Sequence, residues 1–407
     1  MGGTSTNASR LLGVDATRGV ALLGMMAVHV LSASDSDGGP ALSYSVAAGR
    51  SAATFAVLAG VGIAVMTRRT QVPAGREGRA VAASLATRAL AIGAVGLGLG
   101  DTDMVSVILP HYAVLFLLAI PLVFLPSRAL VMVGLAAVVA VPVVSHVIRD
   151  YLPDPLPGNP SFGYLFDDPG RLLIGLLLTG IYPVLPWMAY LCTGLVIGRL
   201  RLSSARVDAR LFGAGLVLAV AAATTSWVLL GPLGGVAQIE SSAVQDGMSA
   251  AEVSDLLAFG PDGTTPTSTW WWLAVDSPHS TTPLDLLHTI GTAVALLGAL
   301  LLLSAHVTLP VLRKLIAAGL MPFAAVGSMT LTLYTTHVLF LSSPLDVYDP
   351  PIDYALQVVV AMLFALIWRT TMKRGPLEAL VAWLAQRARG EKPTPLTRSG
   401  AAPPYQS

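Results

Sequence analysis

The sequence predicts an all-α integral membrane protein that crosses the membrane about ten times, at about 20 residues per span. Only 12% of the 407 residues are Asp, Glu, Lys or Arg, whereas a soluble globular protein carries roughly 25%. Apolar residues make up 54% of the chain, and its mean hydropathy is +0.71. The apolar stretches are rich in Leu, Ala, Val and Gly and lack a period of two, which favours helices over strands.

Charge and cysteine content exclude several classes of protein. The 24 basic and 23 acidic residues give a net charge of +1, so nucleic acid is not an expected partner. Cys192 is the only cysteine, which excludes an intrachain disulfide and a cysteine-based metal cage. The sequence contains neither a GxxxxGK[ST] phosphate loop nor an HExxH motif, so we expect no bound metal.

Ten apolar stretches are long enough to cross a bilayer. They lie, in chain order, at residues 11–31, 46–66, 84–105, 107–125, 129–148, 172–198, 210–230, 284–304, 315–341 and 354–372. The sixth stretch contains Tyr182-Pro183. A kink is expected there, because proline lacks a backbone donor and its ring crowds the preceding turn.

The spans define one transmembrane domain over residues 10–375, flanked by polar ends. Residues 1–9 and 390–407 are polar and are expected to be disordered. Residues 376–389 predict an amphipathic helix on the inner leaflet. Residues 232–283 form the longest loop between spans, and we expect this loop outside the cell.

The basic residues orient the chain. With the N-terminus inside, 21 of the 24 Lys and Arg residues fall on the cytoplasmic side, and only Arg50, Arg149 and Arg171 fall outside. This asymmetry follows the positive-inside rule. It predicts that both the N-terminus and the C-terminus are cytoplasmic.

The first span is the most informative stretch for function. Its sequence RLLGVDATRGVALLGMMAVHV contains Asp15, Arg18 and His29, and a charge within a span costs about 2.5–3.5 kcal/mol on insertion scales. Asp15 and Arg18 can pair at a spacing of three. Arg18 and His29 lie within roughly 20° of one face, about 16 Å apart along the axis. The structural alternative is an arginine that snorkels inward beside its aspartate, and a histidine that bonds a neighbouring helix.

Four motifs in this order resemble a known family. DATRG opens the first span and begins an Arg-x10-His pattern, GRSAATFAVLAGVGIA begins the second span, GSMTLTLYTTHV lies in the ninth and RGPLEALVAW follows the tenth. From about residue 10 to 385 the chain resembles the heparan-α-glucosaminide N-acetyltransferase-like and YeiB-like bacterial proteins of the transmembrane acyltransferase superfamily.

The resemblance implies an activity and a place in the cell. It implies transfer of an acyl group from cytosolic acyl-CoA, with acetyl-CoA as the favoured donor, to an extracytoplasmic glycan or glycolipid. It also implies a multi-pass protein in the lipids of the bacterial cytoplasmic membrane. The resemblance implies that a lysosomal acetyltransferase of this kind uses a histidine in the loop after its first helix. The corresponding loop here, LSASDSDGGPALSYS, contains no histidine, so His29 is the candidate base or acyl carrier. Imidazole can serve as either near neutral pH.

Two further histidines are candidates. In the ninth span Thr330, Tyr334 and His337 recur at i, i+4 and i+7 and therefore share one face. His337 is the second catalytic candidate, with Tyr334 and Thr330 beside it for substrate. Asp285 and His288 are three apart, so the carboxylate could orient the imidazole or raise its basicity. A histidine near a span end can equally be an interfacial hydrogen-bonding group.

The inner loop after the second span supplies cations for the CoA phosphates. Arg68, Arg69 and Arg88 are the candidates, because a guanidinium matches phosphate geometry. The alternative is that these arginines only reflect the positive-inside topology.

The outer side offers two more candidates for substrate binding. Trp271, within Trp270–Trp272, could stack on a sugar ring, or it could belong to the interfacial aromatic belt. Arg50 could bind an acidic acceptor or a developing oxyanion, or it could pair with an outer aspartate. A short helix is expected near Ser249–Phe259.

Other classes of function remain open at this point. A transporter or flippase of a small or lipid-linked molecule would also have about ten spans, a kinked helix and intramembrane charges. A non-catalytic membrane protein of the same fold is another alternative, although it would not need Asp15, Arg18 and His29 on one face. The sequence also leaves a homodimer open.

Overall fold

The computed structural model describes residues 3–102, 104–372 and 374–390, with side chains described from residue 12 onward. Over these residues all the regular elements are helices, and the sole β-bridge is an isolated one between Ser34 and Pro40. The protein is an all-α polytopic membrane protein. Seven of its described helices are long and apolar enough to cross a membrane, or eight when the bent pair formed by α8 and α9 counts as one span.

Four helices surround the centre of the bundle: α1 (Gly3–Val30), α3 (Arg50–Met66), α9 (Val184–Gly198) and α13 (Pro283–Ala305). The other helices are α2 (Leu42–Ala47), α4 (Arg76–Gly98), α5 (Leu109–Leu122), α6 (Ser127–Ile148), α7 (Phe162–Asp167), α8 (Pro169–Ile174), α10 (Ala205–Leu230), α11 (Gly235–Gln245), α12 (Ala250–Phe259), α14 (Pro310–Gly327), α15 (Thr330–Leu341), α16 (Pro350–Thr371) and α17 (Pro376–Ala388). Short turns η1 (Arg149–Tyr151), η2 (Gly175–Thr179) and η3 (Trp270–Ala274) complete the described elements.

Small residues let the central helices approach closely. A Cβ on Gly194 of α9 would lie 1.9 Å from the carbonyl oxygen of Val57 on α3, so only glycine fits there. Leu58 and Leu191 are fully buried beside this contact. On the outside of the bundle, apolar residues of α10 such as Val217 are exposed, as expected where a helix faces lipid.

The predicted kink in the sixth span is confirmed. The segment Pro169–Thr179 and helix α9 are bent by 52° at a break of four residues or fewer. Pro183 lies directly before α9, where its missing N–H costs no helical hydrogen bond. The residues just before the break, η2, form a turn of π-helix.

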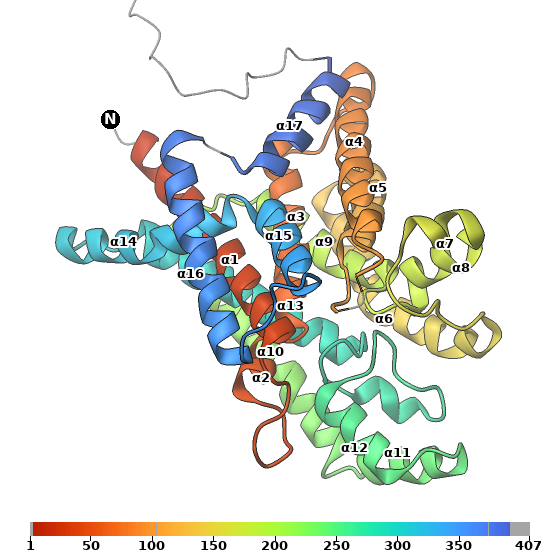
Figure 1. Ribbon diagram of the computed structural model, residues 1–407. Helices are drawn as coiled ribbons and strands as arrows, with labels where there is room; N and C mark the ends of the chain where they lie inside the picture. Colours follow the sequence, from red (N-terminus) through yellow and green to blue (C-terminus); the bar gives the residue numbers. More distant parts are fainter. Residues whose placement is uncertain (1–2, 103, 373, 391–407) are drawn as a thin grey trace, which may run out of the picture.

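The prediction of one continuous ninth span over residues 315–341 is wrong. The structure divides this stretch into α14 and α15, which are separated by Ser328 and Met329. In Figure 1, α14 runs across α1 and α16 rather than along them. The last turn of α14 is buried against α1 from Ala324 to Gly327, whereas its first residues are exposed.

The expected architecture of about ten membrane-crossing helices is consistent with the structure. Each of the ten predicted stretches contains a helix, but α1 and the shorter apolar helices α5 and α15 fall outside the seven that qualify by length and hydropathy. Helix α1 starts at Gly3, earlier than expected, while residues 391–407 of the predicted C-terminal tail lie outside the described residues. The predicted helix over residues 376–389 is α17.

The long loop after α10 folds on itself. Ile239, Ala243, Val253, Trp272 and Val275 form a small buried cluster. The expected short helix is α12, which begins with a capping box between Ser249 and Glu252. Figure 1 places α11 and α12 at the end of the molecule opposite α17 and the N-terminus.

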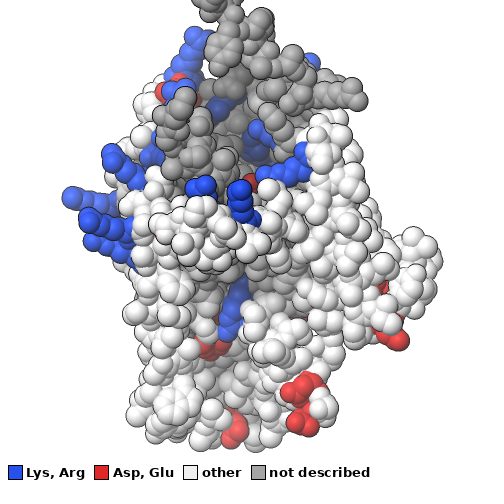
Figure 2. Space-filling view, turned by 90° about the vertical axis from the view of Figure 1, so that its left-hand side faces the viewer, with Lys and Arg blue, Asp and Glu red and all other residues white. Residues whose placement is uncertain are grey.

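The two ends of the molecule differ in charge. Figure 2 shows Lys and Arg gathered over the upper half of one face, and Asp and Glu over its lower half. The upper end is the one that carries α17 in Figure 1. This distribution agrees with a cytoplasmic upper end under the positive-inside rule.

Candidate functional site

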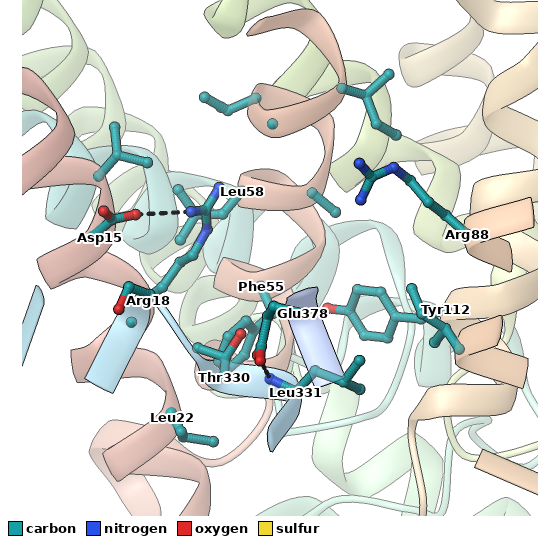
Figure 3. A pocket seen from close by; sticks show the side chains of 18 of the residues that line it. Asp15, Arg18, Leu22, Phe55, Leu58, Arg88, Tyr112, Thr330, Leu331 and Glu378 are labelled. Atoms are coloured by element: carbon teal, nitrogen blue, oxygen red, sulfur yellow. Dashed lines mark hydrogen bonds and ion pairs between the residues drawn. The ribbon is translucent and has the colours of Figure 1, made fainter. Parts of the chain in front are cut away.

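A cavity of about 490 Å³, the inner cavity, is lined mainly by residues of α1, α3, α4, α5, α15 and α17, and its lining includes three arginines. Its charged lining residues are Asp15, Arg18, Arg69, Arg88 and Glu378. Figure 3 labels all of these except Arg69. Its deeper lining is apolar and aromatic and includes Leu22, Met25, Phe55, Leu58, Ile108, Tyr112, Phe116 and Tyr334. Sites for small molecules and cofactors commonly have this size and mixed character. The cavity thus suits a ligand with an anionic end and an apolar end.

The predicted pair of Asp15 and Arg18 forms on the wall of the inner cavity. Arg18 Nη1 donates to Asp15 Oδ1 at 2.9 Å, and both side chains are half-buried. Arg369 on α16 also lies within electrostatic range of Asp15. The guanidinium of Arg18 therefore reaches the cavity while its charge is balanced from its own helix.

Two of the three predicted phosphate-binding arginines line the inner cavity. Arg69 Nη2 and Arg88 Nε are buried and have no hydrogen-bond partner. Buried guanidinium nitrogens without a partner are costly, and an anionic ligand would satisfy them. Arg68 is exposed and lines none of the described cavities.

Glu378 is a cavity residue that sequence reasoning missed. Its Oε1 accepts from the backbone N–H groups of Leu331 and Thr332, and its Oε2 accepts from the Thr332 hydroxyl at 2.6 Å. The carboxylate therefore caps the N-terminus of α15, where a negative charge is favourable. Glu378 lies within the motif RGPLEALVAW, and its place in that motif is the one feature of the sequence that pointed to a functional role. Through this contact α17 packs on the bundle rather than lying apart on the leaflet.

His29 and His337 meet beyond the floor of the inner cavity. His29 Nδ1 lies 3.0 Å from His337 Nε2, and the two rings are nearly parallel, with an interplanar angle of 8° and 5.3 Å between their centroids. Met25 and Tyr334 line the cavity. Each lies about one helical turn, about 5 Å, before its histidine on the same helix. The structure thus joins the first and second catalytic candidates in one pair.

The face predicted for Thr330, Tyr334 and His337 exists on α15. Thr330 and Tyr334 line the inner cavity, and His337 is buried one turn further on. The Tyr334 hydroxyl accepts from the backbone N–H of Ile108 at 3.3 Å. This contact ties α15 to the start of α5.

A second cavity of about 540 Å³, the outer cavity, lies on the other side of the segment 104–112. Ile108, Leu109 and Tyr112 of this segment line the inner cavity. The polar groups that line the outer cavity include Ser106, His111, Asn159, Arg171, Thr179 and Asp262. The side chain of Asn159 bonds the backbone of Thr102, Val105 and Val107. One short segment, held by Asn159, therefore forms a wall between the two cavities.

Aromatic rings extend from His111 at the outer cavity toward the histidine pair. Tyr182 makes edge-to-face contacts with His111 at 5.4 Å and with His279 at 5.5 Å between ring centroids. His279 lies within electrostatic range of His29. Neither His279 nor Tyr182 was predicted as a site residue, because both lie outside the helices whose spacing related the other candidates to one another.

The predicted partnership of Asp285 with His288 is wrong. His288 Nδ1 lies 2.8 Å from a carboxylate oxygen of Asp276. Asp285 instead accepts from the backbone N–H of Thr281 at 2.9 Å, and its own N–H donates to the Thr282 hydroxyl. His288 is paired with Asp276 in the loop before α13. Asp285 instead stabilises the first turn of α13 through its hydrogen bonds with Thr281 and Thr282.

Arg50 and Trp271 lie away from both cavities. Arg50 Nη1 donates to the carbonyl of Ser45 at 2.7 Å, so it pairs with backbone rather than with an outer aspartate. Trp271 packs against the buried cluster around Trp272. Neither residue lines a described cavity.

Acid is expected to destabilise the protein through His279. Burial lowers the pKa of His279 to about 4, against about 6.5 in an unfolded chain. The native state therefore binds fewer protons, and stability is lost as the pH falls from about 6.5 toward 4. His279→Asn should show a smaller fall in melting temperature between pH 7 and pH 5 than wild type. Asparagine tolerates the positive φ of 59° at this position. An equal fall in the variant and the wild type would contradict this assignment.

Comparison with known proteins places the chain in a family. Residues 10–230 match the family described as "Heparan-alpha-glucosaminide N-acetyltransferase, catalytic". This match covers more than half of the 407 residues. The chain belongs to this family of membrane acetyltransferases. No curated protein and no solved structure matches the chain.

The segment that matches the family contains some of the candidate site residues but not all of them. Asp15, Arg18, His29, Arg69 and Arg88 lie within the matched residues. The contributions of α15, α16 and α17 lie beyond them. No group of three or more His, Cys, Asp or Glu side chains is placed to hold a metal in the described parts of the chain.

Proposed function

We propose that this protein moves an acyl group, with acetyl favoured, from cytosolic acyl-CoA to a hydroxyl or amine of an extracytoplasmic glycan or glycolipid. We place it in the bacterial cytoplasmic membrane. The observation that carries the proposal is the inner cavity itself, which has unpartnered arginine nitrogens in its wall and a histidine pair about one turn beyond its floor.

The inner cavity matches the chemistry of acyl-CoA. Arg18, Arg69 and Arg88 would hold the phosphates, since guanidinium groups bind phosphate oxygens through paired N–H donors. The apolar lining between Leu22 and Tyr334 would hold the pantetheine arm and the acyl group. In this arrangement the thioester points toward His29.

His29 would act as the general base. It takes the proton from the acceptor hydroxyl or amine as the acceptor's oxygen or nitrogen attacks the thioester carbon. The C–S bond then breaks, and the CoA thiolate leaves on the cytoplasmic side and receives a proton. An acyl-histidine intermediate is the two-step version of the same transfer. His337 supports His29 from the neighbouring helix.

The outer cavity would hold the acceptor. Its lining mixes hydroxyl, amide, carboxylate and guanidinium groups with apolar side chains, a mixture that suits a hydroxyl-rich ligand attached to lipid. Tyr182 and His279 would lie between this ligand and the histidine pair.

Coenzyme A is expected to raise the melting temperature of the detergent-solubilised protein, because a ligand that binds only the folded state stabilises it by about 2.7 kcal/mol at a hundredfold excess over Kd. Arg88→Glu should weaken this binding at least about tenfold, since a charge-assisted hydrogen bond contributes about 1.5–3 kcal/mol. Arg79→Glu is the matched control, because Arg79 is on the same helix but is exposed and lines no described cavity. Equal stabilisation of wild type and Arg88→Glu would contradict the assignment of the cavity.

Radiolabelled acetyl-CoA distinguishes transfer from transport. Incubation of purified protein with this donor and a crude glycolipid fraction should release free thiol and move the label to lipid or to the protein. A transporter or flippase would release no thiol. Absence of both thiol release and CoA binding would overturn the proposed function.

A further inference from the structure

Two residues of α16 continue a chain of hydrogen bonds that starts at His29. His337 Nδ1 lies 2.6 Å from Gln357 Oε1, and Gln357 Nε2 donates to Asp353 Oδ2 at 2.6 Å. His337, Gln357 and Asp353 are 3%, 9% and 1% exposed. These contacts therefore have little competition from water, and neither Gln357 nor Asp353 belongs to the segment that matches the family.

The chain has a direction that follows from donor and acceptor chemistry. Gln357 Nε2 donates to Asp353 Oδ2, an oxygen that can accept whether the carboxyl group is ionised or neutral, so the amide oxygen of Gln357 faces His337. The amide oxygen only accepts, so Nδ1 of His337 carries the proton. The other nitrogen of His337, Nε2, then holds a lone pair and accepts from Nδ1–H of His29.

The last link is the tautomer of His29. With its proton on Nδ1, the neutral ring of His29 has a lone pair on Nε2. That nitrogen is free to take a proton or to attack a thioester. The opposite direction would require a protonated Asp353 and a flipped amide, and it would leave a proton on Nε2 of His29, which is the wrong form for a base.

We propose that Gln357 and Asp353 are positioning residues that fix His29 in the tautomer with a basic Nε2. Neither residue touches substrate; they act through His337. The catalytic meaning of this inference rests on the proposed acyl transfer, whereas the tautomer itself can be measured without any reaction.

The test combines ¹⁵N spectra of histidine-labelled protein in lipid bilayers with steady-state kinetics. A difference spectrum against His29→Asn identifies the signals of His29. Wild type should show a protonated Nδ1 and an unprotonated Nε2. Gln357→Leu leaves the buried Nδ1–H of His337 without an acceptor, so His337 and His29 should shift mainly to the opposite tautomers, with the proton of His29 on Nε2. Its kcat should fall on the order of 100-fold, as expected when a general base is lost from the reactive form, with the KM for acetyl-CoA unchanged.

Two further variants separate positioning from a structural role. Gln357→Glu places a carboxyl group 2.6 Å from Asp353, so one of the two groups must bind a proton. With that proton between the two carboxyl groups, the other oxygen of the new side chain accepts from His337 Nδ1, and the variant should retain the wild-type tautomer and most of the kcat. Val359→Ala, on an exposed position of the same helix, should behave as wild type. A proton on Nε2 of His29 in the wild type would overturn the inference, as would an equal loss of kcat in Gln357→Leu and Gln357→Glu. Wild-type protein with the expected tautomer but without turnover would instead overturn the proposed function alone.

Discussion

His29→Ala is expected to transfer acyl groups at least about 100-fold more slowly than wild type, because a general base commonly contributes 10²–10⁴-fold. The change removes the imidazole that contacts His337, about one helical turn after the cavity residue Met25. Donor binding should persist, since His29 does not line the inner cavity. The measurement is thiol release from acetyl-CoA, alongside the increase in melting temperature that CoA produces.

A matched control for this variant is His146→Asn. His146 lies in another membrane helix and packs against Trp270, with 4.7 Å between ring centroids and an interplanar angle of 37°. It lines neither the inner nor the outer cavity. Thiol release by His146→Asn should remain near the wild-type rate. A folded His29→Ala protein that keeps the wild-type rate would refute the catalytic role of His29.

Gly327→Ala is expected to destabilise the protein strongly. A Cβ on Gly327 would lie 1.8 Å from the carbonyl oxygen of Asp15 and 2.8 Å from the backbone nitrogen of Gly19. Because these are backbone atoms, α14 would have to move away from α1, and overpacking of this kind costs about 1–3 kcal/mol or more. The shift would also disturb Asp15 and the start of α15, both of which line the inner cavity.

Gly319→Ala on the same helix is the control. A Cβ at Gly319 would meet nothing within 4 Å, and alanine favours a helix over glycine by up to about 1 kcal/mol. The two variants therefore change the helix propensity of α14 equally, but only Gly327→Ala disturbs its packing against α1. Thermal unfolding should show a lower melting temperature for Gly327→Ala and an unchanged or higher one for Gly319→Ala. Equal melting temperatures would mean that the crossing of α1 and α14 is looser than the structure shows.

Local periodicity predicted the elements that depend on neighbouring residues. The Asp15–Arg18 pair, the break at Pro183 and the shared face of Thr330 and His337 all follow from spacing along one helix. The short helix expected near Ser249–Phe259, which is α12, follows from local sequence in the same way. These features involve few residues that are distant in the chain, so a single sequence contains the information for them.

Contacts between distant segments could not be predicted in this way. Gln357 appears in the sequence as one polar residue in an apolar span, and only the packing of α16 brings it to His337. Glu378 caps α15 because α17 folds back on the bundle. The division of the ninth span at Ser328 carries no proline signal at the break itself. It arises where Gly327 packs on α1.

The wall at residues 104–112 has an electrical consequence. With donor and acceptor on opposite sides of this segment, the proposed reaction moves an acyl group outward. The side on which the acceptor's proton is released then decides whether charge crosses the membrane. If His29 passes that proton inward to the leaving thiolate, no net charge crosses the membrane. If the proton is released outside, each turnover moves one positive charge outward, against about 2.3 kcal/mol per 100 mV of membrane potential. A proton path through the histidine pair would thus let the enzyme work at a rate that does not depend on how strongly the membrane is energised.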